Sequence, residues 1–224
     1  MGNNCCAPGP EDAEANGGSP QARSAPPQGN VMSRSVAPSP ARAPASGTAN
    51  STLSFDLVLS DLNKAEELAY GSAFAGFAPS TAGGLGTDCE KLREFVATNC
   101  CVPYEELDMA LLKAASGNGD LKISLSDFLT LMRDNAIHEG LVIERFMSLA
   151  GEGSPSVSAS DCRTGLYMIK DELGAAGSAV GDGRWEAVFD VVMSSAAPTV
   201  ELESWTTYCK QVARIARVTH VAGI

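Results

Sequence analysis

The sequence predicts an all-α protein, in which two pairs of helix–loop–helix units follow a disordered N-terminal tail. Residues 7–50 indicate the tail, because they are mostly Pro, Ala, Ser, Gly, Asn and Gln and bury too little apolar surface to offset their ordering entropy. From residue 53 onward, apolar residues recur at helical spacing on both sides of polar loops. We therefore expect a tail over 1–52, an N-terminal lobe over 53–138 and a C-terminal lobe over 139–224.

The first six residues, MGNNCC, predict a lipid anchor. Gly2 stands at the acceptor position for N-myristoylation, and Cys5 and Cys6 beside it suit S-palmitoylation. One myristoyl chain binds a bilayer only marginally, so stable anchoring needs a second signal. Cys6 departs from the usual Ser or Thr, and the alternative is an accidental start to the tail. The start resembles those of dually acylated pellicle and flagellar membrane proteins in protozoa. This resemblance implies the cytoplasmic face of a plasma, pellicle or flagellar membrane.

Other features favour an intracellular, non-enzymatic protein. No apolar run is long enough to cross a bilayer, and residues 1–20 lack the features of a secretory signal. The seven cysteines follow no framework spacing, so we expect reduced thiols. With only His138 and His220 available, a Cys–His catalytic pair is not expected.

The charge of the chain falls entirely on the predicted lobes. Residues 1–52 contain three acidic side chains and three arginines, so the net charge of −11 belongs to the remainder. An acidic surface repels phosphates, and the sequence has no basic patch with interleaved aromatics. This pattern excludes nucleic acid and favours a basic partner.

The clearest helix–loop–helix unit surrounds a twelve-residue loop at 116–127. Its expected apolar positions are Leu107, Leu111 and Leu112 before the loop, and Phe128, Leu131 and Met132 after it. Loops at 150–161 and 193–204 repeat the pattern. Their flanking apolar residues are Val142, Phe146, Leu149, Cys162 and Leu166 for the first, and Trp185, Phe189, Val192, Trp205, Tyr208 and Cys209 for the second.

The eighth position of each loop is also apolar, as Ile123, Val157 and Val200. We expect these side chains to point inward and each loop to pair with its neighbour through a short strand bridge. A fainter first unit completes the set, with a loop that begins at 78 and is two residues longer. Its apolar positions are Tyr70, Phe74 and Phe77 before the loop, and Leu92, Phe95 and Val96 after it.

Together these four units resemble the EF-hand superfamily, in a calmodulin-like arrangement over about 55–218. The resemblance implies units paired two by two and a groove that holds an amphipathic helix. The alternative is an unrelated helical bundle with Ser- and Gly-rich loops.

The 116–127 loop offers candidate metal ligands, because side-chain oxygens stand at positions 1, 3, 5, 9 and 12 and a carbonyl at position 7. They belong to Ser116, Asn118, Asp120, Ser124 and Asp127, with the carbonyl of Lys122. Only two carry negative charge, and Leu121 stands where a positive φ favours Gly. We expect Ca²⁺ affinity no better than about millimolar, with Mg²⁺ equally suited, and no other cofactor. The remaining loops are not expected to bind metal.

These features favour a membrane-tethered adaptor, largely independent of Ca²⁺, that binds a basic amphipathic helix of a protein partner. Two alternatives remain open: a low-affinity Ca²⁺ sensor acting through the 116–127 loop, and a structural component of a membrane skeleton.

Five methionines lie at groove or core positions, where Met adapts to varied neighbours: Met109, Met132, Met147, Met168 and Met193. The stripe Lys210, Arg214 and Arg217 is expected on a solvated face, or against an acidic partner or lipid headgroups.

Overall fold

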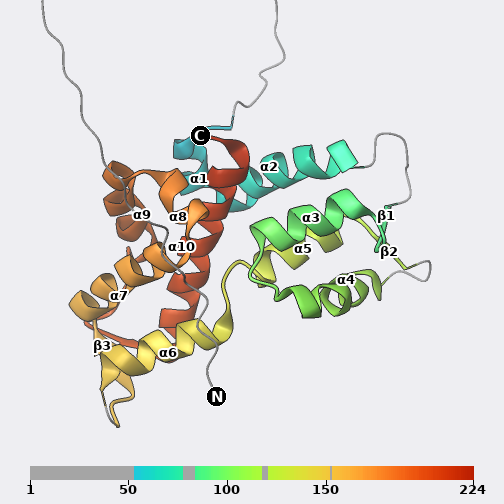
Figure 1. Ribbon diagram of the computed structural model, residues 1–224. Coiled ribbons are helices and arrows are strands. Elements are labelled where there is room, and N and C mark those ends of the chain that lie inside the picture. Colours follow the sequence, from blue (N-terminus) through green and yellow to red (C-terminus); the bar gives the residue numbers. More distant parts are fainter. Residues whose placement is uncertain (1–52, 78–83, 118–120, 152) are drawn as a thin grey trace, which may run out of the picture. The chain divides into compact units, whose positions relative to one another are not determined.

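The computed structural model describes residues 53–77, 84–117, 121–151 and 153–224, where nearly all regular structure is helical (Figure 1). The prediction of an all-α protein is confirmed. The α-helices are α1 (Phe55–Ser60), α2 (Leu62–Phe77), α3 (Glu90–Asn99), α4 (Leu107–Ala115), α5 (Leu125–Asp134), α6 (Glu139–Ala150), α7 (Ala159–Glu172), α8 (Ala175–Val180), α9 (Trp185–Val192) and α10 (Leu202–Ala222). Short 3₁₀ turns, η1 (Tyr104–Glu106) and η2 (Asp182–Arg184), precede α4 and α9, and the strands are β1 (Leu85–Gly86), β2 (Lys122–Ile123), β3 (Ser156–Ser158) and β4 (Thr199–Glu201).

Two-stranded bridges join the loops in pairs, as the apolar residues at the eighth loop position predict. β1 pairs antiparallel with β2, and Leu85 lies opposite Ile123. β3 pairs antiparallel with β4, and Val157 lies opposite Val200. All four side chains are buried. The prediction for these loop positions is therefore confirmed, and Leu85 supplies the fourth.

Aromatic rings pack the helices on either side of β1 and β2. Phe128 lies in the middle of the cluster, and its ring centroid is 5.4 to 6.3 Å from those of Tyr70, Phe74, Phe77 and Phe95. Tilted and edge-on pairs of this kind add about 0.5–1.5 kcal/mol each beyond the area they bury. The aromatic residues expected to flank the fainter first loop therefore lie in a shared core with those of the second.

One residue of this core was predicted wrongly. Leu107 and Leu111 are buried, but the side chain of Leu112 is 42 % exposed. The buried stripe of α4 continues instead to Ala115. Leu112 follows Leu111 directly, and neighbouring residues on a helix do not share a face.

Tryptophans dominate the core around β3 and β4. Trp185 and Trp205 are both buried, and so are Cys162, Leu166 and Cys209, as the sequence predicts. The indole nitrogen of Trp205 donates a hydrogen bond of 2.8 Å to the carbonyl of Val142, which ties α10 to α6. This bond satisfies the one polar atom of the Trp205 side chain.

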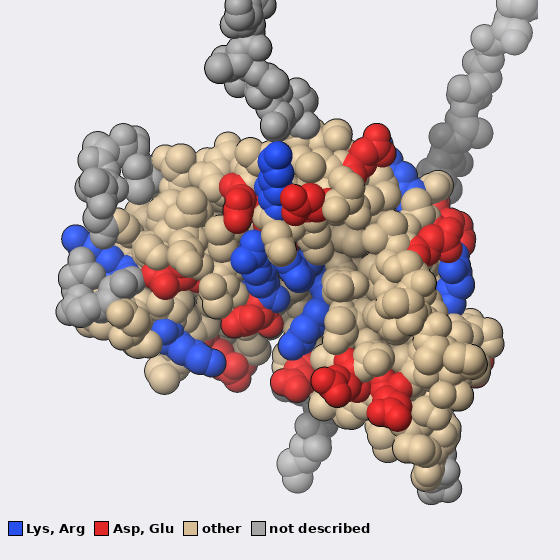
Figure 2. Space-filling view, turned by 180° about the vertical axis from the view of Figure 1, so that it is seen from behind, with Lys and Arg blue, Asp and Glu red and all other residues tan. Residues whose placement is uncertain are grey.

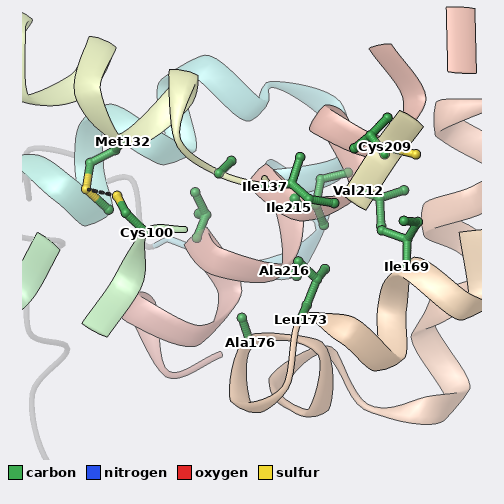
Figure 3. Packing of buried hydrophobic residues seen from close by; sticks show 14 of the residues in the cluster. Cys100, Met132, Ile137, Ile169, Leu173, Ala176, Cys209, Val212, Ile215 and Ala216 are labelled. Carbon is green, nitrogen blue, oxygen red and sulfur yellow. Dashed lines mark hydrogen bonds between the residues drawn. The ribbon is translucent and has the colours of Figure 1, made fainter. Parts of the chain in front are cut away.

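The last helix, α10, connects most of the other helices. It contacts α1, α2, α6, α7, α8 and α9. Figure 3 shows Ile215 of α10 beside Ile137, and Ala216 beside Leu173 and Ala176. Ala49–Ile224 accordingly groups as one unit, and the boundary between two lobes at 138 and 139 stays a prediction. None of the helices among the described residues is long and apolar enough to cross a membrane.

The charged stripe of α10 does not lie on a solvated face, so that expectation is wrong for two of its three residues. Arg217 is 7 % exposed and Arg214 is half-buried, whereas Lys210 is exposed. Between Val212 and Val218 the other residues of α10 are buried as well. A helix that is apolar nearly all round is enclosed by the protein, and its arginines must then find partners inside the chain.

Candidate functional site

The predicted anchor residues Gly2, Cys5 and Cys6 lie outside the described residues. Lipid attachment at these positions therefore stays a prediction.

The structure describes part of the predicted metal-binding loop. Ser116, Lys122, Ser124 and Asp127 are described, whereas Asn118 and Asp120 lie outside the described residues. The Asp127 carboxylate accepts hydrogen bonds from the Ser124 backbone N–H at 2.9 Å and from the Ser124 hydroxyl at 2.6 Å. The Ser124 hydroxyl accepts one in turn from the Asp127 N–H, and together they form a capping box that begins α5. Two of the predicted ligands therefore stabilise the start of a helix.

The turn of this loop forms without glycine. Leu121 has a φ of 54°, and it is the one non-glycine residue with positive φ among the described residues. A side chain in this conformation costs about 1–2 kcal/mol. The sequence led us to expect that Leu121 would oppose the turn, yet the loop adopts it. Within the described part of the chain, no three His, Cys, Asp or Glu residues are grouped so as to hold a metal ion.

Among the described residues, a groove of about 1050 Å³ runs along α4 and α5. It begins near the 116–127 loop, where Lys113, Gly117 and Asp127 line it. At the other end it is lined by the segment after α3 and the segment after α5. The backbone N–H of Cys101 donates to the carbonyl of Asn135 at 2.9 Å and joins these two segments. We call this the closed end of the groove.

The groove combines apolar walls with acidic margins. Its apolar side chains are Val102, Pro103, Met109, Ala110, Ala114, Leu131 and Ile137. Met109 is 68 % exposed and Leu131 is buried. The exposed carboxylates of Glu106, Asp134 and Glu139 line the same groove towards its closed end, and the cations along it are Lys113 and Lys210.

The charges elsewhere on the surface are mixed. In Figure 2, basic side chains gather near the middle of one face with acidic ones around them. The five methionines that were expected at groove or core positions differ in burial. Met132 belongs to the core, whereas Met109, Met147 and Met168 are exposed and Met193 is half-buried.

A buried carboxylate joins three helices behind the groove. Glu66 of α2 is fully buried, and it accepts hydrogen bonds of 2.6 Å from Arg133 Nε of α5 and of 2.6 and 2.7 Å from Arg214 Nε and Nη2 of α10. Arg214 also donates to Asn63 at 2.7 Å. The paired carboxylate raises the pKa of Arg214. A buried carboxylate needs such partners, since desolvation alone would neutralise it.

Arg217 holds the closed end of the groove from inside. Its guanidinium donates to the carbonyls of Ala136 at 2.5 Å and Asn99 at 2.7 Å, and to the sulfur of Cys101 at 2.9 Å. Asn99 ends α3, and Ala136 follows the end of α5. The Asn99 carbonyl is at the end of α3, where carbonyls lack partners within the helix and carry partial negative charge. The same cation also binds the carbonyl of Ala136, two residues beyond the last residue of α5.

Sequence reasoning missed these buried charges. A signal was present in the stretch VARIARVTHV, where apolar residues surround Arg214 and Arg217 on every side of a helix. Glu66 gave a similar signal, because this acidic residue lies on a helix within one turn of the apolar residues Ala65 and Ala69. The groove-lining carboxylates gave none, since exposed acidic residues are common along the whole chain.

Comparisons of the chain with protein-family models, with curated proteins and with solved structures found no match.

Proposed function

We propose that this protein is an EF-hand-like adaptor that is tethered to a membrane and binds a basic amphipathic helix of a protein partner. The EF-hand-like assignment is supported by four loops between helices, joined two by two through short antiparallel bridges with a buried apolar pair. Such bridges are what paired helix–loop–helix units of this superfamily require.

The observation that carries the adaptor function is the α4–α5 groove. Its apolar side chains would take the apolar face of a helix, and the carboxylates of Glu106, Asp134 and Glu139 would pair with lysines or arginines beside that face. The acidic net charge of −11 would attract such a partner over a longer range. Exposed Met109 suits the contact, because its unbranched side chain adapts to the surface it meets.

Binding of a designed helix to the full chain tests this function. The probe is a peptide of about 18 residues, five helical turns, with leucines and alanines on one face and lysines beside them. A control peptide carries glutamates in place of the lysines. We expect calorimetry to detect the basic peptide and not the acidic one.

Two sets of substitutions locate the binding. The variant Glu106→Gln/Asp134→Asn/Glu139→Gln should weaken binding of the basic peptide by about tenfold or more, since each lost pair at an interface costs about 0.5 kcal/mol or more. The matched control Glu172→Gln/Glu186→Gln/Asp190→Asn removes three exposed carboxylates from α7 and α9 and should leave the affinity nearly unchanged. Equal losses in both variants would mean that only net charge matters and would overturn the groove as the site.

The membrane tether is proposed from Gly2, Cys5 and Cys6. Mass spectrometry of the protein from its own cells should find a myristoyl chain on Gly2 and palmitoyl chains on the cysteines. Gly2→Ala should move the protein from the membrane fraction to the soluble fraction. A protein without lipid that still sediments with membranes, or that self-associates into polymers, would favour the structural membrane-skeleton alternative.

A low-affinity Ca²⁺ sensor is the second candidate, and the positive φ of Leu121 favours it, because the 116–127 loop already has its turn. Titration of the full chain with Ca²⁺ in millimolar Mg²⁺, followed by calorimetry and tryptophan fluorescence, separates the two. A transition at or below about millimolar Ca²⁺ that Asp120→Ala abolishes would support the low-affinity sensor, and one below about 10 µM would place the protein in the range of established calcium sensors. A flat response to millimolar Ca²⁺ would leave the adaptor.

A further inference from the structure

We infer that Arg217 is the positioning residue of the groove, so that helix α10 sets the shape of a binding site with which it shares only Lys210. This inference rests on the proposed function for its binding readout, but its structural part is tested without any partner.

Arg217 contacts the wall of the groove from the inside. Cys101, whose sulfur accepts the bond from Arg217, lines the groove, and so do Asn135 and Ile137 on either side of Ala136. Arg217 itself does not line the groove. The two segments at the closed end therefore lie between the guanidinium and the space that a partner would fill.

The geometry requires an arginine rather than any cation. Three different nitrogens of Arg217 reach three acceptors, the carbonyls of Ala136 and Asn99 and the sulfur of Cys101. A lysine presents one ammonium group at a single point and cannot span all three. Arg217 is 7 % exposed, and its bonds to the two carbonyls are buried, so a carbonyl that it leaves gains no water in exchange.

α10 is held in register by a second contact one turn earlier. Glu66 accepts hydrogen bonds from Nε and Nη2 of Arg214, and it also accepts one from Arg133 of α5. α5 is thus joined to α10 through Glu66 at Arg133 and, just beyond the end of α5, through the bond from Arg217 to Ala136. A shift of α10 would move the end of α5, where the groove closes.

This arrangement couples the groove to α10 in both directions. If Arg217 stabilises the wall that a partner recognises, a bound partner must stabilise the contact with Arg217 by the same free energy. The thiols of the chain report on it separately. Cys101 belongs to the wall, whereas Cys162 and Cys209 are buried in the tryptophan-containing core and react only when that core opens.

Alkylation of the native full chain with N-ethylmaleimide, resolved by peptide mass spectrometry, tests the inference. In Arg217→Lys we expect Cys101 to react about tenfold faster or more, the equivalent of one lost charge-assisted hydrogen bond, while the rates of Cys162 and Cys209 stay unchanged. The control Arg163→Lys alters a half-buried arginine on α7 that pairs with the exposed carboxylates of Glu186 and Asp190, and it should change none of the three rates.

The outcomes are separable from those of the proposed function. Faster reaction of all three thiols together would show that Arg217 only supports global stability, and unchanged reaction of Cys101 would show that it does not position the wall. Either result overturns the inference. If the basic peptide fails to bind the wild type, the proposed function fails and the alkylation rates still decide the role of Arg217.

A second measurement uses the wild type, in case Arg217→Lys does not fold. Hydrogen exchange with saturating basic peptide should slow the amides of 214–222 in α10 by about fivefold or more relative to those of α9, as expected for a coupling of about 1 kcal/mol or more. Equal exchange in α10 with and without bound peptide would contradict the coupling.

Discussion

The two pairs of loops, each joined by a strand bridge between flanking helices, share a pattern but differ in the residues that fill their cores. In the N-terminal pair, α2 to α5 with β1 and β2, four aromatic rings pack around that of Phe128. In the C-terminal pair, α6 to α10 with β3 and β4, the core contains Trp185, Trp205 and Phe189. The strand bridge has two residues per strand in the N-terminal pair and three in the C-terminal pair. The same arrangement of loops is therefore compatible with different cores.

The pairs also differ in where their charges lie. The C-terminal pair has ion pairs on its surface, such as those of Arg163 with Glu186 and Asp190. The N-terminal pair has a surface ion pair as well, between Arg93 and Asp108, but it also has the fully buried Glu66, whose partners include Arg214 from the other pair. Apolar repeats thus form each pair, whereas buried charges fix how α10 fits against the N-terminal one.

The largest expected effect comes from Glu66→Gln. It leaves two arginines without a counter-charge in a buried site, so we expect a loss of about 3 kcal/mol or more in the free energy of unfolding. In the C-terminal pair, Glu186→Gln breaks an exposed ion pair and should cost less than about 1 kcal/mol. Urea unfolding of both variants measures the difference, and losses of similar size would mean that the buried charges contribute no more than surface ones.

Alkaline pH should weaken the C-terminal pair through its buried thiols. Burial raises the pKa of Cys162 from 9.0 to about 11. The unfolded chain ionises this thiol near pH 9 while the folded chain holds the proton to about pH 11. The contribution of this thiol to the free energy of unfolding is therefore fully present below pH 9. It is lost between pH 9 and 11, and the loss is about 3 kcal/mol for a pKa shift of this size.

The variant Cys162→Ala isolates this contribution from other groups that titrate at high pH. Its unfolding free energy should decline less steeply than that of the wild type between pH 8 and 11. The difference in unfolding free energy between the two proteins should therefore shrink by about 3 kcal/mol over this range. Parallel curves in urea unfolding would contradict the raised pKa.

Much of this fold could be predicted from the sequence, because its determinants are local. Loop positions such as Val157 and Val200 are apolar in an otherwise polar stretch, and a strand bridge buries them in any sequence with this spacing. Leu112 was the exception, since its neighbour Leu111 was an equal candidate for the same face.

The buried charges could not be predicted in the same way. Arg214 and Glu66 are 148 residues apart in the chain, and a cationic stripe on a helix is compatible with solvent until its tertiary partner is known. The groove was expected only in general terms. Its closed end depends on Arg217, Asn99 and Ala136, which meet only when three helices are assembled.

Substitutions of two glycines should have effects of intermediate size on the free energy of unfolding. A Cβ on Gly177 of α8 would lie 2.3 Å from the carbonyl oxygen of Lys170, which is backbone and cannot move aside. We expect Gly177→Ala to cost about 2 kcal/mol. A Cβ on Gly76 of α2 meets nothing within 4 Å, so Gly76→Ala should raise stability by about 0.5–1 kcal/mol. Thermal unfolding of the two variants should show shifts of opposite sign, and a loss in both would contradict the open space around Gly76.

The smallest expected effect comes from removing the helix caps that follow β2 and β3. Ser124 and Ser158 each accept a hydrogen bond from the N–H of an aspartate three residues on, at 3.2 and 3.1 Å. In the N-terminal pair Asp127 also accepts the backbone N–H of Ser124, which completes the reciprocal box. Ser124→Ala should therefore cost about 1–2 kcal/mol, and Ser158→Ala about 0.5–1 kcal/mol.

Asp127 also makes this cap a test of the metal-binding loop, because its carboxylate is at once the capping acceptor and a predicted ligand. If the loop binds Ca²⁺, millimolar Ca²⁺ should change the cost of Ser124→Ala in urea unfolding and leave that of Ser158→Ala unchanged, since the ion would compete for the same oxygens. An identical cost with and without Ca²⁺ would mean that Asp127 serves the helix alone. The difference between the two pairs would then lie in their cores and in the buried charges that join α10 to the N-terminal pair, and not in the use of Asp127 as a metal ligand.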